Sequence, residues 1–154
     1  MKHKNRTIKK SGNTDVSEFP RPLKLENEVL RFISSSEDFK KYGMFDIVLI
    51  SGSLQYINPY EEIISKVREV NPQYIIIDRI MIGNRKRICK QTVTKSMYEA
   101  SYPVRIFVEE EIEKFWENDY KIIEKDVSSV PEVTYFPEGQ ANSQYFVFER
   151  CSVD

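Results

Sequence analysis

The chain has 154 residues, 40% of them hydrophobic and 12% aromatic, which is enough for one globular domain with its own core. Its formal net charge of −1 gives no reason to expect nucleic acid as a partner. No apolar run is long enough to cross a membrane, and the N-terminus lacks the apolar segment of a signal peptide, so we expect a cytoplasmic protein.

The inventory of reactive side chains narrows the chemistry further. The only histidine is His3, which argues against histidine-based triads and most zinc sites. Cys89 and Cys151 lie far apart and have no neighbouring metal ligands, so we expect reduced thiols and no bound metal. Proton transfer would have to use a carboxylate, a tyrosine, a lysine or water.

The first 24 residues predict a basic, disordered tail, because five Lys or Arg residues fall among the first ten and little periodicity follows. We therefore expect the folded domain over 25–154. It would begin with a short strand over 29–33 and a helix through 39–42, which Gly43 closes.

Residues 45–57, FDIVLISGSLQYI, predict a buried strand that stops abruptly and continues into a loop. Its apolar run has no polar alternation, which is typical of a strand covered on both faces of a parallel sheet. Ligands of such sheets bind at the carboxyl ends of the strands, and glycine there lets a ligand approach the backbone. A ligand site is therefore predicted at Ser51, Gly52, Gln55 and Tyr56.

A crossover unit is predicted next. Asn58 has the features of a helix N-cap and Pro59 those of a first helical residue, with a helix over 59–70 that Asn71 and Pro72 end. A second apolar strand over 74–77 then ends on Asp78 and Arg79. We expect the strands over 45–51 and 74–78 to be parallel neighbours, with the helix crossing between them.

The rest of the chain is expected to extend this sheet. A polar, mobile loop is predicted over 83–95, with a turn of helix over 95–99. Three glutamates from Glu109 open a helix whose apolar stripe is Ile112, Phe115 and Trp116. Strands over 120–127 and 144–150, joined by a long loop, should pair as an antiparallel edge of the sheet.

Three blocks in this order, SGSLQY, IIDR and SYP, carry a resemblance to a known family. Over about residues 25–150 the chain resembles a family of class I S-adenosylmethionine-dependent methyltransferases. The resemblance implies an α/β fold, namely a Rossmann-like sheet with a C-terminal antiparallel strand pair. It also implies S-adenosylmethionine across the strand ends and a small-molecule or glycan acceptor above it.

One feature of that family is missing. Class I enzymes hold the donor with a Gly-rich loop after their first strand, whereas the five glycines here are scattered, at Gly12, Gly43, Gly52, Gly83 and Gly139. The chain thus resembles the carboxyl-terminal part of such an enzyme, incomplete at its N-terminal half. We expect weak or no donor binding by the chain alone. A truncated gene, a fragment, half of a split enzyme and a catalytically silent binding or assembly module all remain open.

Position and resemblance together give each candidate residue a role and an alternative. Ser51 and Gly52 either line the donor or form a tight turn. Gln55 and Tyr56 either orient the acceptor or cap the helix below them. Asp78 either takes a proton or hydrogen bond from the acceptor while Arg79 binds an anionic group, or the two form a structural ion pair.

The later blocks of the resemblance imply acceptor contacts for three further residues, Gln91, Ser101 and Tyr102. The basic run from Arg85 to Arg87 is either a solvated loop or a grip for phosphate. Methyl transfer is an in-line displacement in which positioning can supply about 7–11 kcal/mol of the barrier, so a strong base is not required.

An incomplete sheet also implies an exposed edge beside the strand over 45–51. We expect that edge to be covered, first by the segment over 25–33 of the same chain, and otherwise by a second copy or by a partner chain that carries the missing half.

Overall fold

The computed structural model describes residues 43–93, 100–129, 133–136 and 139–152. The chain divides into two compact units, Met1–Tyr42 and Gly43–Asp154, and the described residues all belong to the second. The predicted tail, the strand over 29–33, the helix through 39–42 and the helical turn over 95–99 lie outside the described residues.

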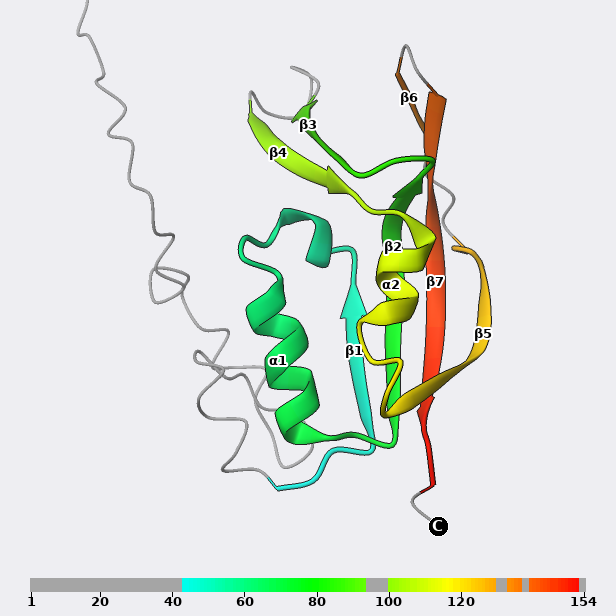
Figure 1. Cartoon of the computed structure of the whole chain (residues 1–154). Helices are drawn as coiled ribbons and strands as arrows, with labels where there is room; N and C mark the ends of the chain where they lie inside the picture. Colours follow the sequence, from blue (N-terminus) through cyan, green and yellow to red (C-terminus); the bar gives the residue numbers. More distant parts are fainter. Residues whose placement is uncertain (1–42, 94–99, 130–132, 137–138, 153–154) are drawn as a thin grey trace, which may run out of the picture. The chain divides into compact units, whose positions relative to one another are not determined.

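The main sheet is mixed and has the strand order β1-β2-β7-β5, with β6 paired to β7 (Figure 1). β1 and β2 are parallel, whereas β7 runs antiparallel to both β2 and β5. β5 therefore points the same way as β1 and β2, and β7 is the reversed strand among these four. The strands are β1 (Ile47–Ser51), β2 (Tyr74–Gly83), β5 (Tyr120–Val127), β6 (Val133–Phe136) and β7 (Gly139–Arg150).

The predicted crossover is confirmed. β1 and β2 are parallel neighbours in a register that pairs Ile47 with Tyr74 and Ser51 with Asp78, and α1 (Glu61–Val70) connects them. The carboxyl end of β1 consequently lies beside Asp78, within β2, which continues to Gly83.

The predicted start of α1 is wrong by two residues, whereas its end is confirmed. The helix begins at Glu61 after a turn in which the Asn58–Pro59 peptide is cis, and its N-cap residue is Tyr60, without a side-chain capping bond. The buried ring of Tyr60 packs in the core, and this tertiary contact outweighs the local capping preference of Asn58. Asn71, in the left-handed conformation at φ 46°, ends the helix.

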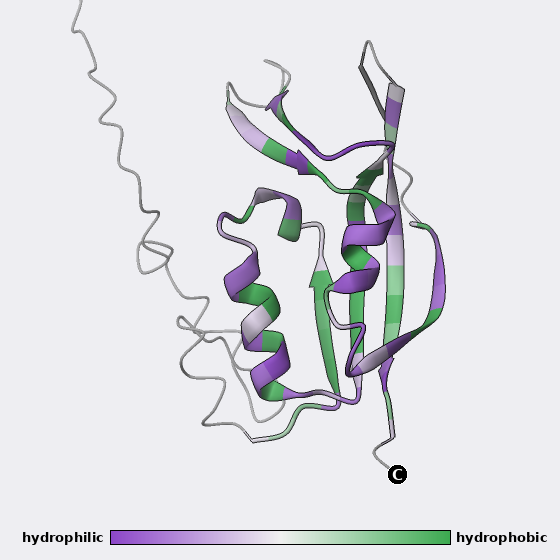
Figure 2. Cartoon of the chain, in the orientation of Figure 1, coloured by the Kyte–Doolittle hydropathy of each residue, from purple (hydrophilic) through white to green (hydrophobic). Residues whose placement is uncertain are grey.

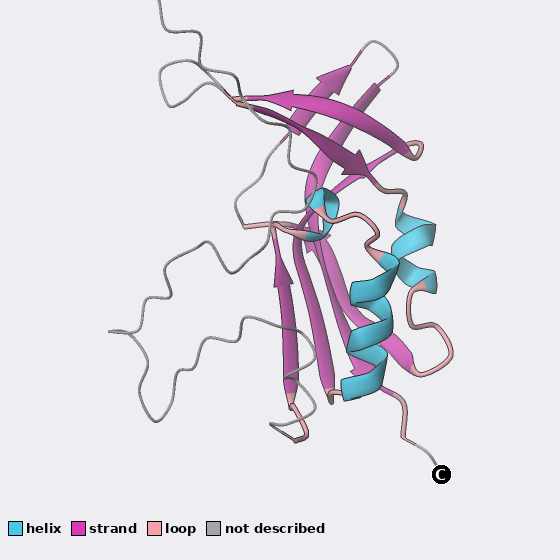
Figure 3. Cartoon of the chain, turned by 90° about the vertical axis from the view of Figure 1, so that its left-hand side faces the viewer, coloured by secondary structure: helices cyan, strands magenta, loops and turns pink. Residues whose placement is uncertain are grey.

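One face of the sheet is covered by α1 and α2 (Glu109–Lys114), which Figure 3 shows on the same side of the strands. The predicted stripe of Ile112, Phe115 and Trp116 is buried and joins one core with Ile64 and Val67 of α1. The sheet supplies to that core Ile50, Ile75, Ile77, Ile80, Phe146 and Phe148. In Figure 2 the ribbons of β1 and β2 are largely in the hydrophobic colour, whereas those of α1 and α2 carry both hydrophobic and hydrophilic residues. None of the helices in the described ranges is long and apolar enough to cross a membrane.

The segment predicted as a mobile loop over 83–95 is largely a strand. β3 (Arg87–Thr92) pairs antiparallel with β4 (Ser101–Ile106) in a separate two-stranded sheet. The sequence of β3 does not show the usual alternation of apolar buried and polar exposed residues, because the charged Arg87 is half-buried while Ile88 is exposed. Periodicity of hydrophobic residues therefore gave no strand signal here.

The two sheets meet at Gly83. Its N–H donates to the carbonyl of Phe107 at 2.9 Å, and the Phe107 N–H donates to the carbonyl of Met81 at the same distance. A Cβ atom at Gly83 would lie 2.8 Å from Cγ2 of Ile106, so only glycine allows this close approach.

The C-terminal strand pair is confirmed: β5 and β7 are antiparallel and form the end of the main sheet opposite β1, with β5 outermost. The bounds need correction, because β7 begins at Gly139, well before the predicted start at residue 144, and β6 occupies part of the predicted loop.

Candidate functional site

The prediction that the second strand ends on Asp78 and Arg79 is wrong. The two residues form a bulge within β2, which continues to Gly83. Between Ile77 and Ile80 the pairing of β2 with β7 shifts, so that β2 carries one more residue than its partner. Arg79 takes the left-handed conformation there, with φ 53°, which costs a residue other than glycine about 1–2 kcal/mol. The bulge thus presents the Asp78 and Arg79 side chains beside the end of β1.

Six residues converge at this point, which we call the strand-end cluster: Ser51, Gly52, Gln55, Asp78, Arg79 and Ser128. The Ser51 hydroxyl donates to Oδ2 of Asp78 at 3.0 Å and accepts from Nε and Nη2 of Arg79 at 3.3 and 3.2 Å. Nε of Arg79 lies 3.7 Å from the same Asp78 oxygen. The Arg79 and Asp78 side chains remain 44% and 30% exposed, so their ion pair contributes little to stability and is open to a ligand.

Gly52 is covered by a protein side chain, although we expected a ligand there. Its φ is 59°, its N–H donates to the Asp78 carbonyl at 2.9 Å, and a Cβ atom would lie 3.2 Å from Nη2 of Arg79. The guanidinium of Arg79 therefore fills the space next to the Gly52 backbone. A ligand that approached this glycine would first have to displace Arg79.

Two buried side chains hold the bulge in place. Nε2 of Gln55 donates to the Arg79 carbonyl at 3.0 Å, and the hydroxyl of Ser128 accepts the Arg79 N–H at 3.1 Å. The Ser128 N–H donates in turn to the carbonyl of Ser143 at 3.0 Å. Gln55 lies on the 3-10 helix η3 (Leu54–Tyr56), so this helix is tied to the bulge.

Ser128 was missed by sequence reasoning, although a signal was present. It is the residue after β5, which is parallel to β1 and β2, so the rule that points to Ser51 applies to it as well. The sequence pattern predicts β5 as one member of an antiparallel pair, and its direction relative to β1 follows only from the position of β7 between β2 and β5.

A second group, the Tyr56 cluster, consists of Tyr56, Gln91 and Tyr102. The Tyr56 hydroxyl donates to Oε1 of Gln91 at 3.0 Å, and the rings of Tyr56 and Tyr102 meet edge to face with centroids 5.4 Å apart. The structure thus brings together three residues predicted from separate blocks. Ser101 does not join them, because it is exposed at the far end of β4, one strand position from Tyr102.

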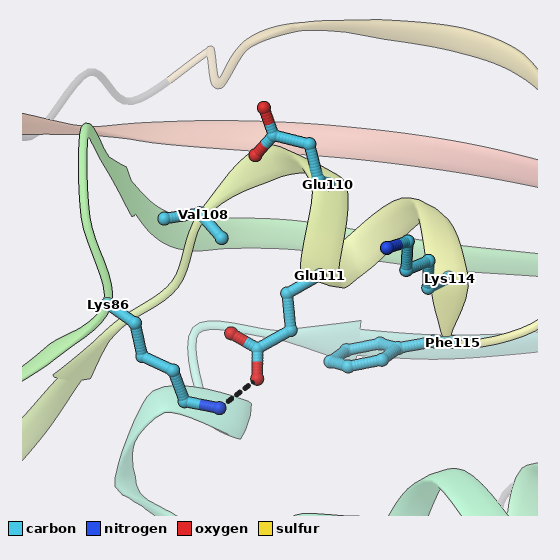
Figure 4. A pocket seen from close by; sticks show the side chains of 6 residues that line it. All are labelled: Lys86, Val108, Glu110, Glu111, Lys114 and Phe115. Carbon is cyan, nitrogen blue, oxygen red and sulfur yellow. Dashed lines mark hydrogen bonds and ion pairs between the residues drawn. The ribbon is translucent and has the colours of Figure 1, made fainter.

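The basic run beside β3 has its own partners. Lys86 forms an ion pair with Glu111 of α2, and both line a cavity of about 440 Å³ (Figure 4). The Tyr60 hydroxyl also donates to Glu111, at 2.7 Å, and burial together with this bond raises the pKa of Tyr60 far above its ordinary value. The guanidinium of Arg105 lies 4.8 Å from the centre of the Tyr60 ring. Glu111 neutralises the charge of Lys86, and phosphate binding by the basic run stays a prediction.

Comparisons with known proteins give one likeness to report. No protein family matches the chain, and no curated protein matches its sequence. Among solved structures the chain is similar to the crystal structure of the N-terminal domain of EvdMO1 with SAH bound, with 14% identity and a TM-score of 0.46. The match covers 78% of this chain and 53% of that one, so the chain spans about half of that domain's length.

Proposed function

We propose that the chain is an S-adenosylmethionine-dependent methyltransferase, or the carboxyl-terminal portion of one, and that it acts on a small-molecule or glycan acceptor. Its sheet topology supports a Rossmann-like class I assignment. Two parallel strands joined by a helix are followed by β5 and β7, with the reversed β7 inserted last. The resemblance in sequence implies a sheet that ends in such an antiparallel pair.

The observation that carries the proposal is the meeting of Ser51, at the carboxyl end of β1, with Asp78 and Arg79 in the bulge of the parallel strand β2. Partly exposed, the carboxylate of Asp78 has the chemistry to accept a proton or hydrogen bond from the acceptor. Arg79 offers a guanidinium for an anionic group. Tyr56 and Gln91 lie on the neighbouring η3 and β3 and would orient the acceptor.

The described residues fit the methyl donor only in part. Arg79 suits the carboxylate of S-adenosylmethionine, but it also covers Gly52, and the scattered glycines provide no Gly-rich loop. When bound, the donor would supply an activated methyl group. Because the fit is incomplete, we derive no transfer step from these residues.

Donor binding by the isolated chain is the direct test. We expect S-adenosylhomocysteine to give no calorimetric signal at micromolar concentration and a weak response in ligand-detected NMR, because only strand-end contacts are available. Arg79→Ala should abolish that weak response, whereas Arg85→Ala, in the exposed turn before β3, should leave it unchanged. Sub-micromolar binding would show that the Gly-rich loop is dispensable and that its absence misled us.

A second candidate is a catalytically silent binding or assembly module with this fold. The position of Arg79 over Gly52 favours it, because the guanidinium occupies backbone space that a donor would need. The same experiment separates the two candidates. If S-adenosylhomocysteine gives no NMR response even at millimolar concentration, the silent module is the better description.

A further inference from the structure

A small cavity lies beside the Tyr56 cluster and is enclosed by four elements. Its volume is about 90 Å³, and it is bounded by η3, β2, β3 and β4. The lining residues are Tyr56, Met81, Cys89, Lys90, Gln91, Val104 and Ile106. The cavity at Lys86 and Glu111 is larger, but its lining carries charged groups that neutralise each other.

The walls of this small cavity are apolar. Met81 and Ile106 are buried in a small hydrophobic cluster separate from the main core, and Cys89 packs against that cluster. Val104, two residues before Ile106 on β4, is also buried and lies on the same face of the strand. The interior therefore offers four apolar side chains.

The mouth of the cavity carries polar groups, among them the neutral amide of Gln91 and the ammonium of Lys90. Gln91 lies two residues after Cys89 on β3, on the same face, and its Oε1 accepts from Tyr56. Its amide nitrogen donates to none of the residues that the structure describes, so it has a donor to offer. Lys90 lies between Cys89 and Gln91 on β3, and this residue is exposed. None of the described residues that line the cavity carries a carboxylate.

We propose that this cavity is a binding subsite for the short aliphatic end of a neutral hydroxyl compound. The apolar part would lie among Met81, Cys89, Val104 and Ile106, and the hydroxyl oxygen would accept a hydrogen bond from the Gln91 amide. Each water-sized group occupies about 30 Å³ in a liquid, so the cavity has room for roughly three or four heavy atoms. Whole-ligand pockets are several times larger, so the cavity receives one group of a larger molecule.

This inference deepens the proposed function, because it names the chemistry of one end of the methyl acceptor. It rests on the proposed function, since only a methyltransferase would use the bound compound as an acceptor. Binding to the cavity can nevertheless be measured without any methyl donor. Cys89 is a natural reporter, since it packs at the cavity wall and the chain has only one other cysteine, the exposed Cys151.

The experiment measures the rate at which iodoacetamide alkylates Cys89 in the full chain carrying Cys151→Ser. The isopropyl end of isobutanol fits the cavity, with its hydroxymethyl group at the mouth beside Gln91. Methanol is too small to fill the cavity, and cyclohexanol is too large. All three are used at concentrations that leave the circular dichroism spectrum unchanged. We expect isobutanol to slow alkylation about threefold at twice its dissociation constant, as mass action requires for a protected site. Methanol and cyclohexanol should have little effect.

Two variants make the test specific. Val104→Phe places a ring in the cavity and should abolish protection by isobutanol, whereas Ile88→Phe adds the same ring on the exposed face of β3 and should not. Gln91→Leu, at a partly exposed position that should tolerate it, removes the proposed donor. It should raise the dissociation constant of isobutanol about fivefold, as expected for one lost hydrogen bond.

Absence of protection by isobutanol would overturn the proposal, and so would equal protection by all three alcohols. Protection that persists unchanged in both Val104→Phe and Gln91→Leu would also overturn it. The outcome is independent of the S-adenosylhomocysteine titration. Donor binding without protection would leave the proposed function standing and remove the subsite, whereas protection without donor binding would do the reverse.

Discussion

At the scale of single residues, Arg79 connects backbone strain with the candidate site. It takes a left-handed conformation inside a strand, and both of its main-chain polar groups are held by side chains of other elements, Ser128 and Gln55. Strain of this kind persists only where the surroundings fix it, and it is concentrated at functional positions. The hydrogen bonds of Gln55 and Ser128 therefore hold the bulge, and the bulge places the Arg79 guanidinium over Gly52.

Gly52→Ala should destabilise the protein by about 1–2 kcal/mol through backbone conformation alone, because φ is 59° there. The added Cβ, 3.2 Å from Nη2 of Arg79, should also displace the guanidinium from Ser51. Urea unfolding measures the loss of stability. Gly43→Ala is the matched control, since Gly43 is also left-handed, with φ 83°, but has open space around its Cβ direction. Equal losses at the two glycines would contradict a packing role for Arg79.

All residues of the strand-end cluster except Ser128 could be predicted from the sequence. The apolar run before Ser51 locates the end of β1, and parallel pairing brings it beside Asp78, although β2 continues to Gly83. The bulge could not be predicted, because it is defined by pairing with β7, which is distant along the chain. The position of Arg79 over Gly52 follows from the bulge and was hidden for the same reason.

At the scale of elements, the start of α1 shows tertiary contacts overriding a local signal. The ring of Tyr60 packs edge to face on Phe107, with centroids 5.2 Å apart, and lies 5.7 Å from Phe115. Its hydroxyl reaches Glu111 of α2. One side chain thus joins the two helices and the core, which local capping rules for Asn58 and Pro59 cannot anticipate.

Tyr60 should make stability depend on alkaline pH. Its pKa in the folded state is raised from 10.0, first by burial and then by the bond to Glu111, so its contribution is complete below pH 10 and is lost as the pH rises toward the folded value. Tyr60→Phe should lower the free energy of unfolding by about 1 kcal/mol at neutral pH and flatten its decline at alkaline pH. Urea unfolding across that pH range measures both effects.

The control for this prediction is Tyr145→Phe. Tyr145 also donates to a glutamate, Glu124, and its pKa is also raised, but it lies toward solvent on β7. Its replacement should change the alkaline slope less than that of Tyr60. If the two variants showed the same slope as the unmodified protein, burial of the Tyr60 hydroxyl would not contribute as argued.

At the scale of the whole described unit, helices cover one face of the sheet, and β1 is one of its edge strands. β1 is the terminal strand in the order β1-β2-β7-β5, so one side of its main chain has no strand neighbour among the described residues. Ile47 and Leu49 lie two residues apart on β1, both on the face away from the helices, and their exposed fractions are 55% and 62%. The apolar run of β1 predicted burial on both faces, and the described unit buries one.

An exposed apolar edge strand is a template for pairing with another chain. The first covering that we expected, by the segment over 25–33, lies outside the described residues. The second, association between two copies, can be tested at the exposed residues of β1. Edge-to-edge pairing of β1 would satisfy the main-chain groups that have no strand partner among the described residues, and the Ile47 and Leu49 side chains of both copies would become cross-strand neighbours.

We therefore expect the purified chain to show concentration-dependent association in light scattering. Leu49→Lys should raise the dissociation constant of this association about tenfold or more, because a charge would then face the partner's apolar surface. Ile88→Lys is the matched control, since Ile88 on β3 is 64% exposed but lies outside the main sheet. It introduces the same charge at nearly the same exposure and should leave association unchanged. A strictly monomeric chain, or an equal effect of both lysines, would show that β1 is not the contact between copies.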